Sequence, residues 1–155
     1  MYSNDIVCDI LDFVDNNLLF KFSIDDICKS LNYNRFYLMK LFKKELGVSI
    51  NSYINMVKVY KSLSFIRDGN SFLSVSLKCG FYSLEYFSEM FKKILGVSPS
   101  IYKKIVNYNN NIDLDSYDLC VLNLSILEDK LSFISDYKSR RKPKISPVKK
   151  LSIFV

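Results

Sequence analysis

The chain has 155 residues, of which 49% are hydrophobic, and it carries a net charge of +6 from 22 basic and 16 acidic side chains. A chain of this length buries one ordinary core or two very small ones, and this composition excludes an intrinsically disordered protein. The positive balance permits a polyanionic partner such as nucleic acid, although many proteins without such a partner share it.

Several classes of protein are disfavoured by what the sequence lacks. Its apolar runs fall short of the roughly 20 residues that span a bilayer, and residues 1–5 do not resemble a basic signal-peptide start. We therefore expect a cytoplasmic protein without a membrane partner. A glycine-rich phosphate loop and a nucleophile elbow are also missing, so we expect neither an enzyme nor a bound cofactor.

The chain has four cysteines and no histidine. The cysteines are too far apart in sequence to form a paired metal-ligand motif. Each is interpreted as a small buried hydrophobe rather than as a metal ligand or a disulfide partner; they are Cys8, Cys28, Cys79 and Cys120.

A first subdomain is predicted over residues 5–50. Residues 5–17 carry apolar side chains at helical spacing with aspartates opposite, which predicts an amphipathic helix. Ser23 and Asp26 have the spacing of a capping box and open a second, short helix. Asn32 follows, and asparagine tolerates the positive φ that a tight turn between two helices needs.

A third helix is predicted over residues 35–46, with Asn34 as its cap and Gly47 at its end. Its inward side chains are Leu38, Leu41, Phe42 and Leu46. A long pattern without a helix breaker then predicts a linking helix over residues 51–68.

The sequence then repeats itself. The letters FKKELGVS of residues 42–49 return as FKKILGVS at residues 91–98, 49 positions later. Such a period predicts one supersecondary unit used twice. The second copy forms a predicted subdomain over residues 69–107.

This second subdomain has the same order of elements. A short helix is predicted over residues 73–79, followed by a turn at Gly80. Ser83 then caps a helix over residues 84–95, and Pro99 stands at the first position of a last helix, where its missing N–H costs little.

Two helices joined by a tight turn form a helix-turn-helix, whose second helix typically lies in the major groove of DNA. Such units also occur as plain packing units. Two copies on a rigid connecting helix could place residues 35–46 and 84–95 in successive major grooves, about 34 Å apart, without a dimer. The sequence thus predicts an all-α fold of two helix-turn-helix subdomains, homeodomain-like in character, and a C-terminal extension.

Residues 5–106 resemble the DNA-binding domain of the AraC/XylS family of bacterial transcription regulators. The match is strongest in residues 80–99, GFYSLEYFSEMFKKILGVSP, which follow the family signature G-F-x-x-x-x-Y-F-x-x-x-F-K-x-x-x-G-x-S-P. The resemblance implies sequence-specific binding to double-stranded DNA, usually with activation of transcription through contact with RNA polymerase. Most family members carry a ligand-sensing domain before this part, and none is evident before the first helix here.

The resemblance places base-facing positions of the first unit on Arg35, Phe36, Met39 and Lys40. The two cations could donate to guanine, and the two apolar side chains could pack on a thymine methyl group. A solvated surface or a phosphate contact is the alternative interpretation for Arg35 and Lys40.

In the second unit, the DNA-facing positions fall on Tyr82, Leu84, Glu85, Ser88 and Glu89. An arginine is common in the family where Glu89 stands, so this unit departs from the pattern. Carboxylates repel phosphates, although a glutamate can accept a hydrogen bond from cytosine N4. The second unit is therefore predicted to read cytosine, to bind weakly or to support the first unit.

Phosphate contacts, which position a protein without reading sequence, are predicted for a third group of residues: Asn34, Lys43, Lys44, Ser83, Lys92 and Lys93. The four lysines lie near helix ends, so favourable interaction with the helix C-termini is the alternative interpretation.

The C-terminal extension, residues 108–155, has no counterpart in the family's DNA-binding domain. A helix is predicted over residues 114–137, with a helical stripe of apolar residues: Tyr117, Val121, Leu124, Leu127, Leu131 and Ile134. Further apolar residues widen this stripe, which predicts packing on the domain or self-association. Residues 138–150 are a basic linker or a DNA-grasping arm, and residues 151–155 resemble a strand.

We therefore expect a DNA-binding transcription regulator that acts as an activator. The alternative is a degenerate relative that acts as a protein-interaction module on another regulator or on RNA polymerase. A steep fall of DNA affinity with salt would favour the first hypothesis, because phosphate contacts release counterions.

Overall fold

Eight α-helices form the described part of the chain, which comprises residues 3–107 and 113–140 of a computed structural model. In chain order they are α1 (Ser3–Asn17), α2 (Ile24–Leu31), α3 (Arg35–Leu46), α4 (Ile50–Arg67), α5 (Phe72–Lys78), α6 (Leu84–Leu95), α7 (Pro99–Val106) and α8 (Leu114–Ser139). These ranges contain no strand, and the predicted all-α class is confirmed.

The helix bounds agree closely with the predicted ones. α3 and α6 have the predicted ranges, and α4 and α5 each lie one residue earlier than predicted. The prediction that a basic linker begins at Lys138 is wrong, because α8 continues through Ser139. The rest of that linker and the strand-like residues 151–155 lie outside the described residues, apart from Arg140 at the end of α8.

Polar side chains at the helix starts explain this agreement. The capping box is confirmed: Asp26 N–H donates to the Ser23 hydroxyl, and Ser23 N–H donates to the Asp26 carboxylate at 2.8 Å. These bonds lower the pKa of Asp26. Asn32 adopts the predicted left-handed conformation at φ 57°. A serine hydroxyl caps each helix from α4 to α7; the serines are Ser49, Ser71, Ser83 and Ser98.

The molecule has two hydrophobic cores, one for each helix-turn-helix unit. The first core joins α1, α2 and α3 to the N-terminal half of α4, and Phe42 is fully buried in it. The second joins α5, α6 and α7 to the C-terminal half of α4, with Phe87 and Phe91 fully buried. α4 therefore contributes to both cores and connects the two units.

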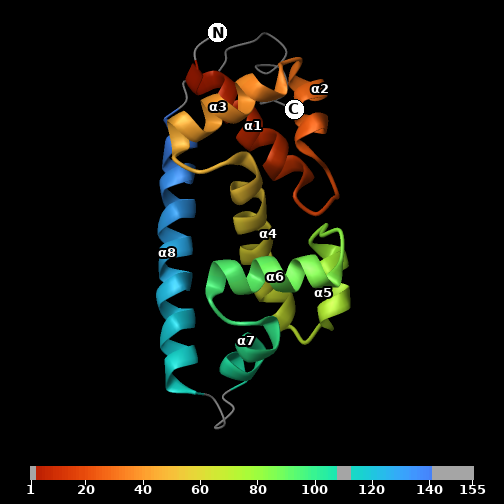
Figure 1. The fold of residues 1–155 in the computed structure, drawn as a ribbon, viewed down its shortest axis with the longest axis vertical. Helices are drawn as coiled ribbons and strands as arrows, with labels where there is room; N and C mark the ends of the chain where they lie inside the picture. The colour runs from red at the N-terminus through yellow and green to blue at the C-terminus, as the bar shows by residue number, and fades with distance from the viewer. Residues whose placement is uncertain (1–2, 108–112, 141–155) are drawn as a thin grey trace, which may run out of the picture.

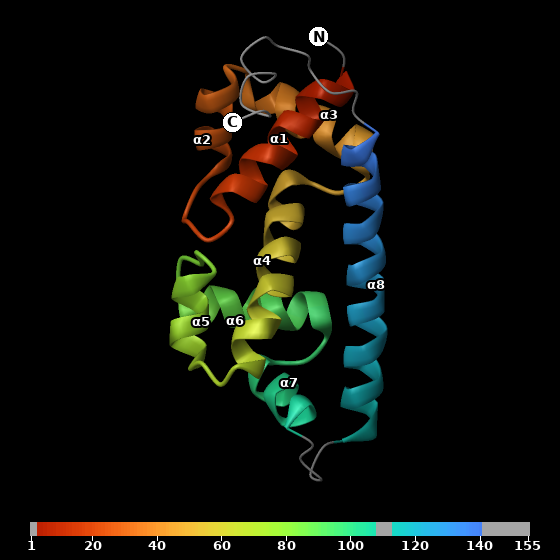
Figure 2. The ribbon, with the colours of Figure 1, turned by 180° about the vertical axis from the view of Figure 1, so that it is seen from behind.

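α8 also contributes to both cores. It runs along one side of the molecule for nearly its whole length, as Figures 1 and 2 show. Cys120 and Leu127 are buried in the second core, whereas Ile134 and Tyr137 are buried in the first. The predicted apolar stripe is buried only in part, because Tyr117 and Val121 are exposed. Apolar residues surround α8 on most sides, so helical spacing alone does not select the buried face.

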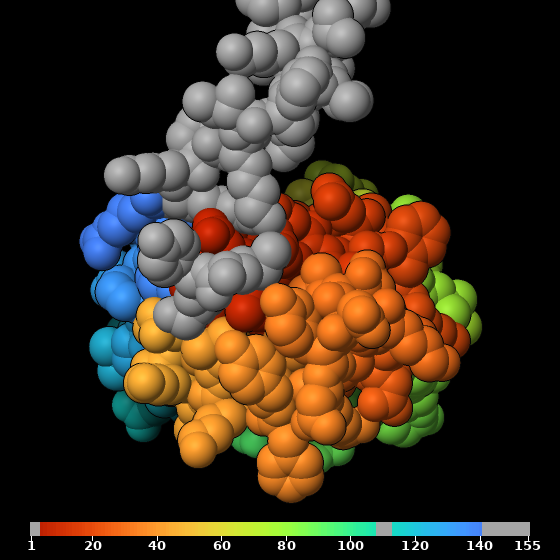
Figure 3. Space-filling model, turned by 90° about the horizontal axis from the view of Figure 1, so that it is seen from above, coloured from red at the N-terminus to blue at the C-terminus, as the bar shows by residue number. Residues whose placement is uncertain are grey.

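α3 and α6 lie on the same face of the molecule. In Figure 1 α6 passes in front of α4 and α3 passes in front of α1, whereas in Figure 2, seen from behind, α6 lies beyond α4 and α3 lies beyond α1. Both run from the side of α2 and α5 toward the side of α8 (Figure 1). From above, the orange surface of α3 forms the lower part of the view, with the blue end of α8 at its left (Figure 3).

Candidate nucleic-acid interface

The first turn of α3 is fixed by Asn34. The Asn34 side-chain oxygen accepts from the backbone N–H groups of Phe36, at 2.8 Å, and Tyr37, at 3.4 Å. This cap leaves the next side chains projecting from the surface: Phe36 is 86% exposed, and Met39 and Lys40 are also exposed. Because a phenyl ring exposed to this extent contributes little to folding, its exposure is consistent with contact to a partner.

Arg35, at the start of α3, forms an ion pair within the chain. Its guanidinium lies 3.1 Å from the carboxylate of Asp25 on α2, and both side chains are more than half exposed. Exposed ion pairs contribute about 0–1 kcal/mol, so a base or phosphate can replace Asp25 at low cost. The predicted base contact of Arg35 is compatible with this position.

The second unit presents a different surface. Tyr82 is 64% exposed, and Glu85 and Glu89 are exposed. Ser88 and Leu84 are half-buried, and Leu84 packs in part against the second core. The surface of α6 therefore presents two carboxylates in its first two turns and two lysines in its last turn.

The residues predicted to contact phosphates fall into two groups. Asn34 and Ser83 are helix caps, and the Ser83 hydroxyl accepts from Tyr86 N–H at 3.0 Å. The four lysines are exposed in the last turns of α3 and α6: Lys43, Lys44, Lys92 and Lys93. This position is compatible with phosphate contact and with the alternative interpretation, interaction with helix C-termini.

Lys58 of α4 joins the two units, and sequence patterns did not single it out. Its side chain is buried, with 4% exposed, and its ammonium donates to the carbonyls of Phe20, at 3.0 Å, and Gly80, at 2.8 Å. Phe20 precedes the helix-turn-helix of the first unit, whereas Gly80 is the turn of the second. The same ammonium lies over the ring of Phe22 at 5.0 Å.

Further contacts strengthen this joint. Asn55 of α4 donates to the Tyr86 hydroxyl at 3.0 Å, and the Tyr82 hydroxyl donates to the Phe22 carbonyl at 3.3 Å. A Cβ atom at Gly80 would lie 2.5 Å from the Phe20 carbonyl oxygen, so only glycine permits this approach. These contacts hold the turn of the second unit against the segment between α1 and α2 of the first unit.

Burial without a carboxylate partner lowers the pKa of Lys58 from 10.5 to about 8. The two carbonyls and the aromatic ring favour the ammonium form and offset part of this cost. The joint therefore contains a cation that is protonated at neutral pH and held by uncharged groups.

α8 is attached to the first unit by polar contacts as well as by its core residues. The Lys138 ammonium lies 2.7 Å from the Asp12 carboxylate and 2.6 Å from that of Asp15. The Tyr137 hydroxyl donates to Glu45 of α3 at 3.1 Å. These contacts keep the last turn of α8 helical and explain why it extends past the predicted end.

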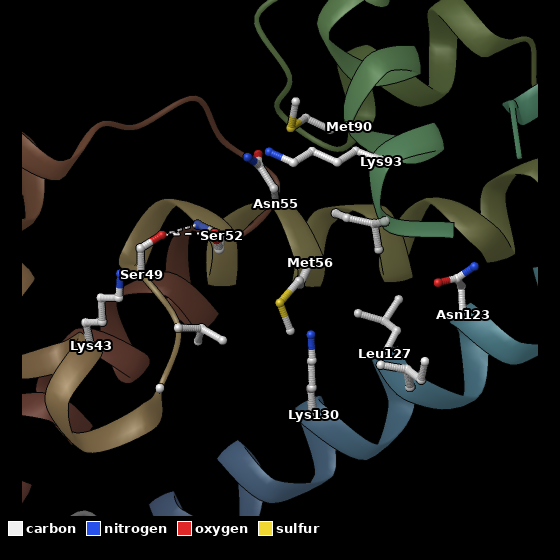
Figure 4. A pocket seen from close by; sticks show the side chains of 14 residues that line it. Lys43, Ser49, Ser52, Asn55, Met56, Met90, Lys93, Asn123, Leu127 and Lys130 are labelled. Atoms are coloured by element: carbon white, nitrogen blue, oxygen red, sulfur yellow. Dashed lines mark hydrogen bonds between the residues drawn. The ribbon is translucent and has the colours of Figure 1, made fainter. Parts of the chain in front are cut away.

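A cavity of about 450 Å³ lies between the two units and α8. Figure 4 shows side chains that line it. Its lining includes Lys43 from α3, Lys93 from α6 and Lys130 from α8. Sequence reasoning missed Lys130, because nothing in the sequence indicates that α8 lies beside α3 and α6.

The described residues offer little for other kinds of site. Cys8, Cys79 and Cys120 are buried, Cys28 is partly buried, and no disulfide joins any two of these four described residues. Burial raises the pKa of Cys79 to about 11. Within the described ranges there is no group of three or more His, Cys, Asp or Glu that could hold a metal ion, and no helix long and apolar enough to cross a membrane.

Comparison with known proteins gives a consistent result. Residues 27–105 match a family model described as a helix-turn-helix domain, of the AraC type. The chain is 29% identical over 103 residues to the HTH-type transcriptional activator AarP of Providencia stuartii. The aligned region covers 66% of this chain and 76% of that protein.

Two solved structures share the fold. The C-terminal domain of AraT, a response regulator from Geobacillus stearothermophilus, has a TM-score of 0.63 and 23% identity, covering 70% of this chain and 91% of that one. The DNA-binding domain of AdpA, solved in complex with a target DNA, has a TM-score of 0.61 and 17% identity, and the match covers 69% of this chain and 97% of that one. The family match, the paired helix-turn-helix units and the exposed first turn of α3 lead to one conclusion: the chain belongs to the AraC-type helix-turn-helix family of DNA-binding transcription regulators.

Proposed function

We propose that the chain reads a bipartite DNA site by placing α3 and α6 in two successive major grooves of one duplex. The observation that carries this proposal is the position of both helices on one face of the molecule, α3 in front of α1 and α6 in front of α4 (Figures 1 and 2). α4 has 18 residues and is therefore about 27 Å long. A separation of this order suits the roughly 34 Å between successive major grooves.

The two units are proposed to contribute unequally. The first unit reads bases through Arg35, Phe36, Met39 and Lys40, all of which are exposed on α3. The second unit presents Glu85 and Glu89, which repel phosphates but can accept from cytosine N4. We infer that the first unit supplies most of the affinity and that the second adds a preference for cytosine.

Activation through RNA polymerase is the proposed consequence of binding. AarP is described as a transcriptional activator, which supports activation rather than repression.

Self-association through residues 114–137 also stays a prediction. It is supported by an exposed apolar stripe on α8: Leu119, Leu122, Ile126 and Phe133. Sedimentation of the free chain at several concentrations measures it.

Selection of bound duplexes from a random DNA pool tests the proposed function. The wild type should enrich two half-elements about one helical turn apart. An Arg35→Ala, Lys40→Ala double variant should lose or relax the half-element read by the first unit. Enrichment of a single half-element would contradict the role of the second unit, and no enrichment would favour the protein-interaction module.

A further inference from the structure

The cavity between the two units and α8 is basic. Its three lysines come from separate elements, Lys43 in the last turn of α3, Lys93 in the last turn of α6 and Lys130 in the middle of α8 (Figure 4). None of them forms an ion pair with another described residue. Among the described residues that line the cavity there is no carboxylate, and Asp129, the chain neighbour of Lys130, is not one of them.

Few acidic side chains lie near these lysines. Glu89 stands one turn before Lys93 on α6 and forms no ion pair with it. α4 begins at the cavity, with Ser49 as its cap and Ser52 in its first turn, so the positive end of the helix dipole adds to the lysines. The carboxylate of Glu45, in α3, accepts from the Tyr137 hydroxyl. The aspartates of α1 that face α8 are neutralised by Lys138 instead.

The position of the cavity relates it to bound DNA. α3 and α6 cross the same face, and the cavity lies between their C-terminal parts. When two helices occupy successive major grooves of one duplex, the sugar-phosphate strands that separate those grooves must pass between the helices. A phosphate strand on this path would meet these ammonium groups.

We propose that Lys130 of α8 binds the phosphate backbone between the two half-elements, together with Lys43 and Lys93. α8 is thereby part of the DNA interface as well as a brace between the two units. Lys130 sets affinity and its salt dependence without reading bases, because an ammonium on a phosphate carries no sequence information. This inference rests on the proposed two-groove function.

The test compares Lys130→Gln with Lys61→Gln on a duplex selected by the wild type. Lys61 is an exposed lysine of α4 and does not line the basic cavity. It lies instead beside Leu18 and Tyr60, at other hollows of the surface. The slope of log affinity against log salt concentration measures the number of phosphates that the protein neutralises, because each phosphate contributes about 0.9 to the size of the slope. Lys130→Gln should reduce this slope by roughly one unit, whereas Lys61→Gln should leave it unchanged.

Two further measurements separate charge from folding. Lys130→Arg should restore the slope, and both glutamine variants should keep the wild-type sequence preference in the random-pool selection. Replacing phosphates between the half-elements by neutral methylphosphonates should weaken the wild type more than Lys130→Gln. A wild-type slope in Lys130→Gln would overturn this inference alone, whereas a wild type that binds no duplex would overturn the proposed function with it.

Discussion

Lys58 shows how much one residue contributes to the arrangement of the two units. It is buried, and its only described hydrogen-bond partners are the carbonyls of Phe20 and Gly80. Burial holds its pKa near 8, against 10.5 for an exposed lysine. Between these pH values the native lysine is largely neutral, while the lysine of the unfolded chain is still charged.

This difference predicts a pH dependence of stability. From pH 8 to pH 10.5 the native state binds fewer protons at Lys58 than the unfolded state, so the free energy of unfolding should rise with pH in this window. A neutral amine still donates two hydrogen bonds, so the joint remains intact. Urea unfolding of the wild type and of Lys58→Met across the window measures the effect. The free energy of unfolding of the wild type should rise with pH relative to that of the variant.

A control on the same helix isolates this effect. Lys61→Met removes an exposed lysine, and its difference from the wild type should stay constant over the same pH range. An equally constant difference for Lys58→Met would show that the native pKa of Lys58 is close to its ordinary value. The burial of its charge would then cost nothing.

At the scale of elements, α8 is an integral part of the fold. Ile134 is 4% exposed and lies in the first core, whereas its neighbour Phe133 is 51% exposed. We expect Ile134→Ala to lower the free energy of unfolding by about 2–4 kcal/mol and Phe133→Ala to change it by roughly 0.5 kcal/mol or less. Chemical denaturation of both variants makes the comparison, and equal small losses would mean that α8 does not pack on the first unit.

Local signals were sufficient to predict most of the elements. Asn32, Ser23 and Asn34 act within a few residues of their own position, and each has the predicted role. The buried face of α8 depends instead on residues far away in sequence. Because Asp12 and Glu45 attach its last turn to the first unit, no local pattern reveals its end or its orientation.

The candidate site was predictable only where the repeated motif determines it. The exposed positions of α3 follow from the helix-turn-helix pattern, and the structure places Phe36 and Lys40 on the surface as expected. Lys58 and Lys130 were not predictable, because an isolated lysine on a helix is typical of a solvated surface. Their positions arise from tertiary packing: Lys58 lies against the carbonyls of Phe20 and Gly80, and Lys130 lines the basic cavity.

At the scale of the whole molecule, three connections fix the relative position of α3 and α6. α4 contributes to both cores, Lys58 joins the two units near the start of α6, and α8 spans both units on the opposite side. Connections on both sides of α4 restrict rotation of one unit against the other. A rigid pair of recognition helices should accept only one spacing and one relative orientation of the half-elements.

The most direct test of this account is the affinity for a selected duplex whose half-elements are moved apart by about five base pairs, which is roughly half a helical turn. The insertion places the second half-element on the opposite side of the duplex, so α3 and α6 can no longer read both at once. The account predicts a loss of roughly tenfold or more, down to the affinity for a duplex with a single half-element. An affinity equal to that for the original spacing would contradict it.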